Sequence, residues 1–248
     1  MNFFVSGLFH NDNISKKINE IINGKKILEI GGPSPNNYWI PKFYEISLYT
    51  DIINFSDQNN ISLELGCKEK LNDNLKYRKI YKLNIDDTYE YINFIEKDYD
   101  IILTCHCLEH QANPIKQLLL WKKLLKKGGI IINILPEKSL TLDCNRPITK
   151  FSKIIQKYED NIEEDDITEI DEMILYKNTN PDKISGITNI CALEDLKNNP
   201  SNIKKYRPLH QHVYDFNLLK NISNFINMKQ FMEFNIYLDN WVFWIDNE

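Results

Sequence analysis

Apolar segments that read as β-strands alternate with helix-like segments along the first 136 residues. The strand-like segments are residues 26–30, 43–51, 77–87, 99–105 and 130–136. The last of them, IIINILP, is nearly all apolar, as expected for a strand that is covered on both faces. This alternation predicts a Rossmann-like, doubly wound α/β sheet of mostly parallel strands. A chain of 248 residues, 42% of them hydrophobic, can bury one such core.

Two of the helix-like segments carry clear end signals. In residues 13–26, isoleucines recur at helical spacing and Gly24 is a natural stop. In residues 113–129, Asn113 can cap the helix start and Pro114 suits the first turn. The pair Gly128-Gly129 predicts the end of this second helix.

The segment ILEIGGPSPN places two glycines directly after the first predicted strand. Doubly wound sheets bind ligands at the carboxyl ends of their strands, where the strand order reverses. Gly31 and Gly32 allow the backbone to approach a ligand without a Cβ in the way. Asp51 follows about 20 residues later, at the predicted end of the second strand, where an acid can accept hydrogen bonds from ribose hydroxyls. The sequence therefore predicts a nucleoside-containing ligand at this edge.

The chemistry of this loop restricts the ligand further. Dinucleotides usually need G-x-G-x-x-G to hold their pyrophosphate, and that spacing is missing here. Pro33 and Pro35 remove amide donors, and Glu29 inside the strand would repel phosphate. An acid at this place suits a cofactor with a positive amino group and a sulfonium. We therefore expect S-adenosylmethionine, with S-adenosylhomocysteine as its product.

At this point the sequence resembles the class I S-adenosylmethionine-dependent methyltransferases. The resemblance covers roughly residues 25–138, where five elements follow in the family's order, and only the glycine loop departs from the common G-x-G-x-G form. It implies a seven-stranded sheet that ends in an antiparallel hairpin, here residues 231–246. The cofactor-binding residues that it implies are Glu29, Gly31, Gly32, Pro33, Ser34, Asp51, Asp86, Asp87, Cys105 and His106.

A narrower resemblance begins after the fifth strand. LPEKSLTLDCNRPIT, residues 135–149, is similar to the P-D-K-x-x-T-F-D-x-x-R-P-x-T run of a methyltransferase subfamily associated with bacterial surface-polysaccharide and other small-molecule pathways. Glu137 and Leu142 replace its Asp and Phe. We expect residues 1–138 to form the cofactor-binding core, residues 139–208 an inserted substrate-binding or lid region, and residues 209–248 the completion of the core.

The inserted region contains a strongly acidic stretch. Residues 159–172 carry nine acids and no Lys or Arg. Such a run suits either a mobile acidic lid over the pocket or a solvated helix face or loop. In both cases it would be a poor surface for a polynucleotide.

Histidine is the usual general base near pH 7, and four of the five histidines form two pairs beside the expected pocket. His106 is expected at the cofactor, and His110 either orients the acceptor or caps a helix start. His210 and His212 resemble an H-x-H segment that follows the variable insert in the narrower family. They act either in function, as catalytic base or acceptor ligands, or as structural hydrogen-bonding groups. The predicted catalytic residues are thus His110, His210 and His212.

Four residues are predicted to bind the acceptor. Arg146 offers a planar fork for carboxylate or phosphate, or else pairs with Asp143 to hold its loop. Tyr206 and Arg207 are weaker candidates. Asp143 could join the histidines in a nitrogen and oxygen metal site, but local zinc spacings are missing and we expect no metal.

The acceptor class follows mainly from what the sequence lacks. The net charge is -5, whereas nucleic-acid binders usually carry a basic face. The N/D-P-P-Y/F/W loop and the Pro-Cys nucleophile of DNA methyltransferases are absent. No stretch is long enough to cross a bilayer, and five cysteines without a C-x-x-C pair fit reduced thiols. We therefore expect a cytoplasmic protein that acts on a small molecule and contacts neither nucleic acid nor membrane.

The preferred hypothesis is a metal-independent methyltransferase that acts on an oxygen, less readily a nitrogen, of a small polar metabolite. A sugar or a phosphorylated or phosphoramidate precursor of a capsule or other surface glycan is the specific expectation, and it comes from the narrower resemblance. Transfer of another group, as in aminopropyltransferases, is one alternative. A non-catalytic scaffold or sensor that binds S-adenosylmethionine is the other. The sequence predicts no oligomeric state.

Overall fold

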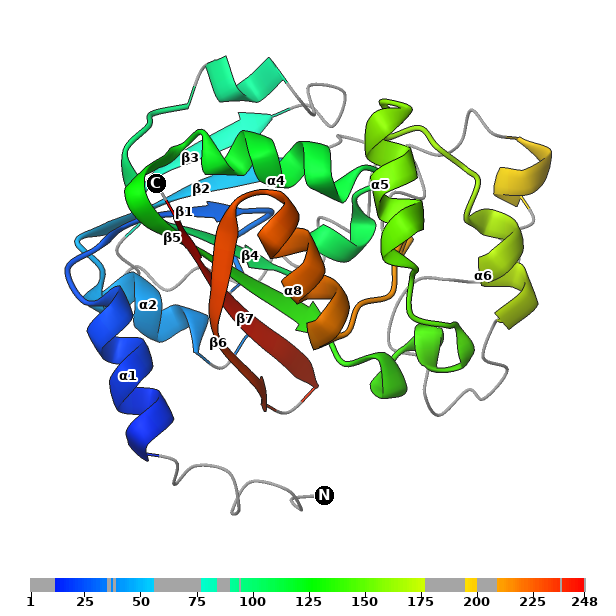
Figure 1. Cartoon of the computed structure of the whole chain (residues 1–248). Helices are drawn as coiled ribbons and strands as arrows, with labels where there is room; N and C mark the ends of the chain where they lie inside the picture. The colour runs from blue at the N-terminus through cyan, green and yellow to red at the C-terminus, as the bar shows by residue number, and fades with distance from the viewer. Residues whose placement is uncertain are drawn as a thin grey trace.

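One seven-stranded sheet forms the centre of the protein, in the order β3-β2-β1-β4-β5-β7-β6 (Figure 1). The computed structural model describes residues 12–34, 37, 39–55, 77–83, 90–93, 95–176, 195–199, 209–236 and 238–247. The strands are β1 (Lys26–Ile30), β2 (Tyr49–Phe55), β3 (Tyr77–Leu83), β4 (Tyr99–Cys105), β5 (Leu125–Pro136), β6 (Met228–Ile236) and β7 (Asp239–Asp246). Strands β1 to β5 pair in parallel, whereas β7 is antiparallel to both β5 and β6. The predicted doubly wound sheet with a C-terminal antiparallel hairpin is confirmed.

Helices cover both faces of this sheet (Figure 1). On one face lie α1 (Asp12–Ile22) and α2 (Ile40–Ile46), which bury Ile18, Ile22 and Phe43. On the other lie α4 (Pro114–Lys122), α5 (Phe151–Glu159) and α8 (Phe216–Phe225). The shorter helices are η2 (Glu90–Asn93), η3 (Leu108–His110), η4 (Lys138–Leu140), η5 (Leu142–Asn145) and α6 (Ile170–Tyr176). None of the described helices is both long and apolar enough to cross a bilayer.

The prediction of a strand at residues 43–51 is wrong at both ends. Its first residues belong to α2, where Phe43 and Tyr44 are buried at helical spacing. The strand β2 begins at Tyr49 and continues to Phe55. Asp51 therefore lies inside β2, opposite Leu28 of β1, and not at the end of its strand.

The helix predicted at residues 113–129 begins correctly and ends too late. The Asn113 side chain accepts a hydrogen bond from the Lys116 amide at 3.1 Å, as an N-cap should. The helix α4 ends at Lys122, however, and β5 starts at Leu125. The register of β5 on β4 shifts between Tyr99 and Ile101, and Gly128 has φ +70°. The glycine pair therefore forms part of a β-bulge in β5 and does not end the helix.

The acidic stretch at residues 159–172 is tied to the rest of the protein by ion pairs. Glu163 binds Lys116 of α4 at 2.7 Å, and Glu169 binds Lys153 of α5 at 2.6 Å. Lys157 of α5 pairs with both Asp166 and Glu169. Five of its nine acids, Glu159, Asp160, Glu163, Asp165 and Asp171, are exposed, as the alternative of a solvated loop expects, and a mobile lid over the pocket stays a prediction.

The inserted region contributes to two apolar clusters. Ile154 of α5 is buried in the cluster that also contains α4 and α8. Ile170, Met173, Leu196 and Leu209 form a smaller cluster of their own. The proposed division at residues 139 and 208 stays a prediction.

Candidate active site

The strand order reverses between β1 and β4, and the predicted glycine loop lies at this point. Gly31 follows β1 directly with φ +80°, and its amide donates to the carbonyl oxygen of Ile53 at 2.9 Å. His106 follows β4 directly with φ +48°. The first residues after two neighbouring parallel strands are thus brought together at the edge where such sheets bind ligands.

Glu29 is fully buried directly beneath the glycine loop. A Cβ on Gly32 would lie 2.4 Å from the carboxyl carbon of Glu29, so only glycine fits above this acid. Tyr44 donates its hydroxyl to Glu29 Oε2 at 2.5 Å, and the Ser34 amide donates to the same hydroxyl oxygen at 3.1 Å. Among the described residues, Glu29 Oε1 accepts no hydrogen bond. Burial raises the pKa of Glu29 to about 7.

Asp51, the predicted ribose ligand, lies in the core. It is fully buried, and its Oδ2 accepts a hydrogen bond from the Tyr99 hydroxyl at 2.6 Å. The polar side chain that β2 places beside the loop is Asn54, whose Nδ2 donates to the Gly32 carbonyl oxygen at 2.7 Å. Sequence reasoning missed Asn54 because it ended the strand at Asp51. The apolar residues Ile52, Ile53 and Phe55 were the signal that the strand continues.

His106 forms a small polar group with residues that lie far away in the sequence. Its Nε2 lies 2.7 Å from Oδ1 of Asp239 at the start of β7. Asn37 donates to Asp239 Oδ2 at 3.2 Å and lies 3.8 Å from the sulfur of Cys105. Burial lowers the pKa of His106, but the hydrogen bond and charge of Asp239 and the charge of Glu109 outweigh it, so this pKa lies above its ordinary value. The predicted cofactor residues Cys105 and His106 thus lie at the sheet edge.

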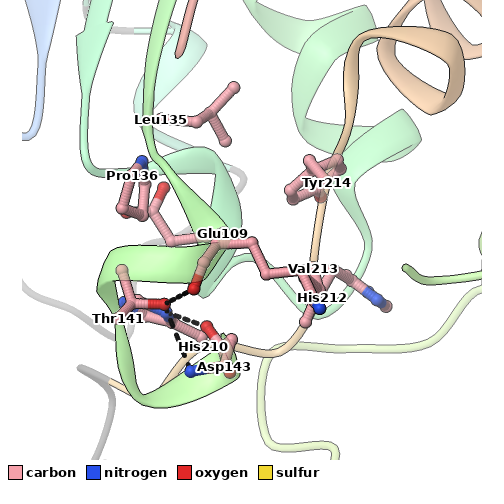
Figure 2. A pocket seen from close by; sticks show the side chains of 10 residues that line it. Glu109, Leu135, Pro136, Thr141, Asp143, His210, His212, Val213 and Tyr214 are labelled. Atoms are coloured by element: carbon pink, nitrogen blue, oxygen red, sulfur yellow. Dashed lines mark hydrogen bonds and ion pairs between the residues drawn. The ribbon is translucent and has the colours of Figure 1, made fainter. Parts of the chain in front are cut away.

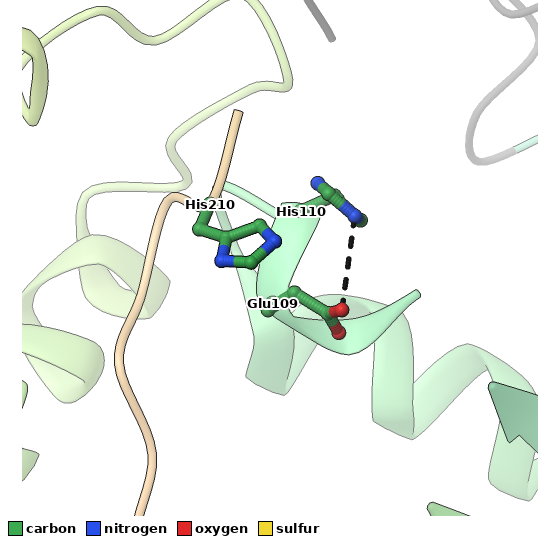
Figure 3. A group of neighbouring side chains, drawn as sticks. All are labelled: Glu109, His110 and His210. Atoms are coloured by element: carbon green, nitrogen blue, oxygen red, sulfur yellow. Dashed lines mark ion pairs between the residues drawn. The ribbon is translucent and has the colours of Figure 1, made fainter. Parts of the chain in front are cut away.

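A second polar group lies next to this edge and brings together His110 and His210 (Figure 3). Their ring centroids are 4.9 Å apart, although the residues are separated by a hundred positions. His110 Nδ1 lies 3.1 Å from the carbonyl oxygen of Leu209, and His210 Nδ1 lies 2.5 Å from Asp143 Oδ2. Because these partners accept hydrogen bonds, each histidine carries a proton on Nδ1. The Nε2 atom of each ring is left for another partner.

The pKa values of the two rings shift in opposite directions. Burial lowers the pKa of His110 to about 4, so this ring is neutral at pH 7 and its Nε2 has a lone pair. Burial also lowers the pKa of His210, but the hydrogen bond and charge of Asp143 raise it above its ordinary value. For Asp143, the same partner and Arg146 outweigh burial and hold the pKa below its usual range. The pKa of His110 therefore lies below its ordinary value and that of His210 above it.

Glu109 completes this group, and sequence reasoning missed it. The side chain is 2% exposed, and neither carboxylate oxygen accepts a hydrogen bond from any described residue. Its Oε1 lies 3.7 Å from His110 Nε2. A pocket of ≈ 10 Å³, about the space of one water molecule, opens beside Glu109. Its lining includes Asp143, His210 and Thr141 (Figure 2).

Arg146 uses its guanidinium N–H groups within the protein, which leaves none of them for the methyl acceptor. It is 2% exposed and makes five hydrogen bonds within the protein, as many as a guanidinium has N–H groups. Nη1 donates to Asp143 at 2.7 Å and to the His210 carbonyl oxygen at 2.8 Å, and Nη2 donates to Glu172 at 3.0 Å. The pairing with Asp143 that competed with acceptor binding is therefore confirmed. The prediction that Arg146 binds the acceptor is wrong for this arrangement of the loop.

His212 has different contacts from His210 and does not belong to the group of Glu109, His110 and His210. Its ring is 1% exposed, and its Nε2 lies 3.2 Å from the carbonyl oxygen of Ala112. Burial lowers its pKa to about 4. These contacts favour the structural alternative for His212. The remaining predicted site residues Asp86, Asp87, Tyr206 and Arg207 lie outside the described residues.

Comparison with known proteins finds similar solved structures at low sequence identity. No family model matches the chain, and no curated protein matches it. The seven-stranded sheet with its C-terminal antiparallel hairpin is the architecture that the resemblance to class I methyltransferases implied. A similar solved structure is a SAM dependent methyltransferase from Aquifex aeolicus, with 11% identity and a TM-score of 0.47, covering 94% of this chain and 88% of that one.

Two further structures belong to methyltransferases with known cofactor or reaction type. Magnesium protoporphyrin IX methyltransferase from Synechocystis PCC 6803, with bound SAH, has 7% identity and a TM-score of 0.46, covering 95% of this chain and 83% of that one. The CurJ carbon methyltransferase has 13% identity and a TM-score of 0.47, covering 92% of this chain. The chain spans 50% of the CurJ structure.

Proposed function

We propose that the protein binds S-adenosylmethionine at the carboxyl edge of β1 and β4 and transfers its methyl group to an oxygen, less readily a nitrogen, of a small polar metabolite. The observation that carries this proposal is Glu29, a buried acid directly beneath a glycine loop at the point where the strand order reverses. A carboxylate there attracts a cationic ligand and repels phosphate. When bound, S-adenosylmethionine supplies a methyl group on a sulfonium, and the bonding electrons stay with the sulfur as the new bond forms.

The residues of this edge fit such a ligand. The absence of a Cβ at Gly32 lets the Glu29 carboxyl group lie directly against the loop backbone, and Glu29 Oε1 lacks a partner among the described residues. Asn54 holds the loop through the Gly32 carbonyl oxygen. Cys105 and His106 end the neighbouring strand β4. We assign Glu29, the loop of Gly31 to Ser34, Asn54 and His106 to the cofactor site.

The group of Glu109, His110 and His210 is suited to the acceptor. It follows β4 by a few residues, and so lies next to the proposed methyl donor. A hydroxyl group that accepts the methyl group must lose its proton during transfer. The neutral Nε2 of His110 and the carboxylate of Glu109 can take up this proton. Holding the acceptor in line with the donor can contribute ~7–11 kcal/mol in well-oriented cases. Asp143 and Arg146 act as positioning residues because they hold His210 and its loop.

The acceptor itself is proposed from two observations. Glu109, Asp143 and His210 line the pocket beside Glu109, and these side chains can hydrogen-bond polar groups of an acceptor. The resemblance of residues 135–149 to the narrower methyltransferase subfamily supports a sugar or a phosphorylated or phosphoramidate precursor of a surface glycan. We propose that the protein is a cytoplasmic enzyme that acts on this small molecule and has neither nucleic acid nor a membrane as partner. A non-catalytic scaffold that only binds the cofactor is the less favoured alternative.

Calorimetric titration with S-adenosylmethionine and S-adenosylhomocysteine tests the proposal. Two variants on β2 form a matched pair: Asn54→Ala loosens the loop, whereas Asp51→Asn changes a core residue that keeps its bond from Tyr99. Loss of one hydrogen bond of about 1 kcal/mol predicts about a fivefold weaker affinity for Asn54→Ala. The affinity of Asp51→Asn should stay near that of the wild type. Failure of folded wild-type protein to bind either compound would refute the cofactor site.

Methyl transfer is then tested with tritiated donor and a panel of sugars and sugar phosphates. Turnover that is lost in His110→Gln, with cofactor affinity unchanged, supports the acceptor site. Binding of the cofactor without transfer to any extract of small molecules would favour the scaffold alternative.

A further inference from the structure

Three potential metal ligands converge next to the sheet edge (Figure 3). One ligand atom each from Glu109, His110 and His210 lies within 4.8 Å of the others. We propose that these three residues bind a divalent transition-metal ion, with Zn²⁺ as the simplest occupant. No metal was expected from the sequence, because it has no local zinc spacing and Glu109 was not among the candidate ligands.

Both histidines are oriented in the way that metal-binding histidines are. Such a histidine almost always donates its second ring N–H to a carboxylate, a backbone carbonyl or water, which fixes the tautomer and the ring. His110 uses the carbonyl oxygen of Leu209 at 3.1 Å, and His210 uses the carboxylate of Asp143 at 2.5 Å. Asp143 is in turn held by Arg146 at 2.7 Å. The two Nε2 atoms are therefore the ones available to an ion.

Glu109 supplies independent support for a cation. Its carboxylate is 2% exposed, and none of the described residues donates a hydrogen bond to either oxygen. A buried acceptor without a donor costs free energy, and more so when it is ionised. The separation of 3.7 Å between Glu109 Oε1 and His110 Nε2 is too long for a hydrogen bond. An ion between them would give the carboxylate its missing partner.

The spacing requires a small adjustment on binding. In a tetrahedral zinc site with bonds of ~2.0–2.1 Å, the ligand atoms are roughly 3.3 Å apart. The three ligand atoms here all lie within 4.8 Å of one another, and Glu109 Oε1 lies 3.7 Å from His110 Nε2. Each pair therefore has to close by no more than about 1.5 Å for an ion to be bound by all three side chains.

The ligand set selects the class of metal. Two imidazoles and one carboxylate hold catalytic zinc with an open position, and also suit ferrous iron. Mg²⁺ and Ca²⁺ prefer oxygen ligands throughout. The pocket of ≈ 10 Å³ that borders Glu109 and His210 has room for one small oxygen ligand beside these two residues.

The role of the ion rests on the proposed function. An acceptor hydroxyl that binds a divalent ion loses its proton more readily, because the ion stabilises the oxyanion. The proton would pass to solvent or buffer, and the oxygen would then form its bond to the methyl carbon as the carbon–sulfur bond breaks. In this arrangement His110 and His210 act as ligands, and no histidine needs to act as the base.

The test is titration of EDTA-treated full-length protein with Zn²⁺ alone, followed by calorimetry, and with Co²⁺, followed by visible absorption. We expect one ion per chain and intense d–d absorption of tetrahedral Co²⁺. The ligand variants Glu109→Gln and His110→Gln should each weaken Zn²⁺ binding at least tenfold, since even outer-shell changes cost 10–100-fold. His106→Gln removes a nearby histidine that is not a ligand, and its affinity should stay within about twofold of the wild type. Thermal unfolding shows whether each variant is folded.

Two outcomes would overturn the proposal: no stoichiometric Zn²⁺ binding by folded wild-type protein, or equal weakening in His106→Gln and the ligand variants. The same preparation is titrated with S-adenosylmethionine. Cofactor binding without zinc binding would refute the metal site alone. Zinc binding without cofactor binding would refute the proposed function alone.

Discussion

Replacement of Glu29 by glutamine should change how the stability of the protein depends on pH. Burial raises the pKa of Glu29 from its ordinary 4.5 to about 7 in the folded state. At ~1.4 kcal/mol for each tenfold change in the ionisation constant, this rise corresponds to about 3 kcal/mol. Because the folded-state pKa is raised, the contribution is fully present below pH 4.5 and is lost as the pH rises through 7. Glutamine cannot ionise, so Glu29→Gln should not show this loss.

The groups around Glu29 do not ionise in the pH range over which Glu29→Gln is compared with the wild type. Tyr44 and Cys105 face it, and burial raises the pKa values of both, so neither ionises between pH 5 and pH 8.5. Glutamine keeps an oxygen that can accept the hydrogen bond of the Tyr44 hydroxyl. The difference between variant and wild type therefore isolates the ionisation of Glu29.

Urea unfolding at several pH values measures the effect. The free energy of unfolding of Glu29→Gln, relative to the wild type, should rise by about 3 kcal/mol between pH 4.5 and pH 8.5. Glu45→Gln changes an exposed acid of α2 that pairs with Lys42 and serves as the control. Parallel stability curves for wild type and Glu29→Gln would refute the argument that the carboxyl group is buried without full compensation.

Three further predictions test other parts of the site. Binding of S-adenosylmethionine, if it ionises Glu29, should release about 0.9 proton per site at pH 6 and about 0.1 at pH 8, given a folded-state pKa of about 7; calorimetry in buffers of different ionisation enthalpy measures this, and equal release at both pH values contradicts it. Gly32→Ala should lower cofactor affinity more than tenfold because a Cβ there lies 2.4 Å from Glu29 Cδ; unchanged affinity by equilibrium dialysis would show that the loop can move aside. Tyr99→Phe removes the donor to buried Asp51 and should cost about 1–3 kcal/mol in urea unfolding, so a loss below about 0.5 kcal/mol would show that Asp51 does not depend on Tyr99.

Several elements could be predicted because their signals are local. The strands at residues 26–30 and 99–105 are short apolar runs, and the start of α4 has a capping Asn and a following Pro. Such signals depend only on residues that are neighbours in the chain, so they can be recognised before the tertiary structure is known. Element ends were less predictable. The glycines at 128 and 129 act as a helix stop in isolation, but pairing of β5 with β4 draws them into a bulge.

The candidate site also has a part that could be predicted from local sequence and a part that could not. The glycine loop and Glu29 come from one stretch of sequence, so their proximity follows directly from the strand that carries them. Asn54 was missed because pairing with β1 extends β2 beyond the residue at which its local pattern was read.

The sequence by itself determined the doubly wound sheet and the place of the glycine loop, because alternating apolar segments must pair and be covered in this way. The closing hairpin was expected only from the resemblance to class I methyltransferases. Only the tertiary structure decided which polar groups meet. Glu109 and His110 follow β4, whereas His210 lies about a hundred residues later, and nothing local relates them. Packing of the segment after the insert against η3 brings them together, and the internal bonds of Arg146 decide that it holds this arrangement instead of binding an acceptor.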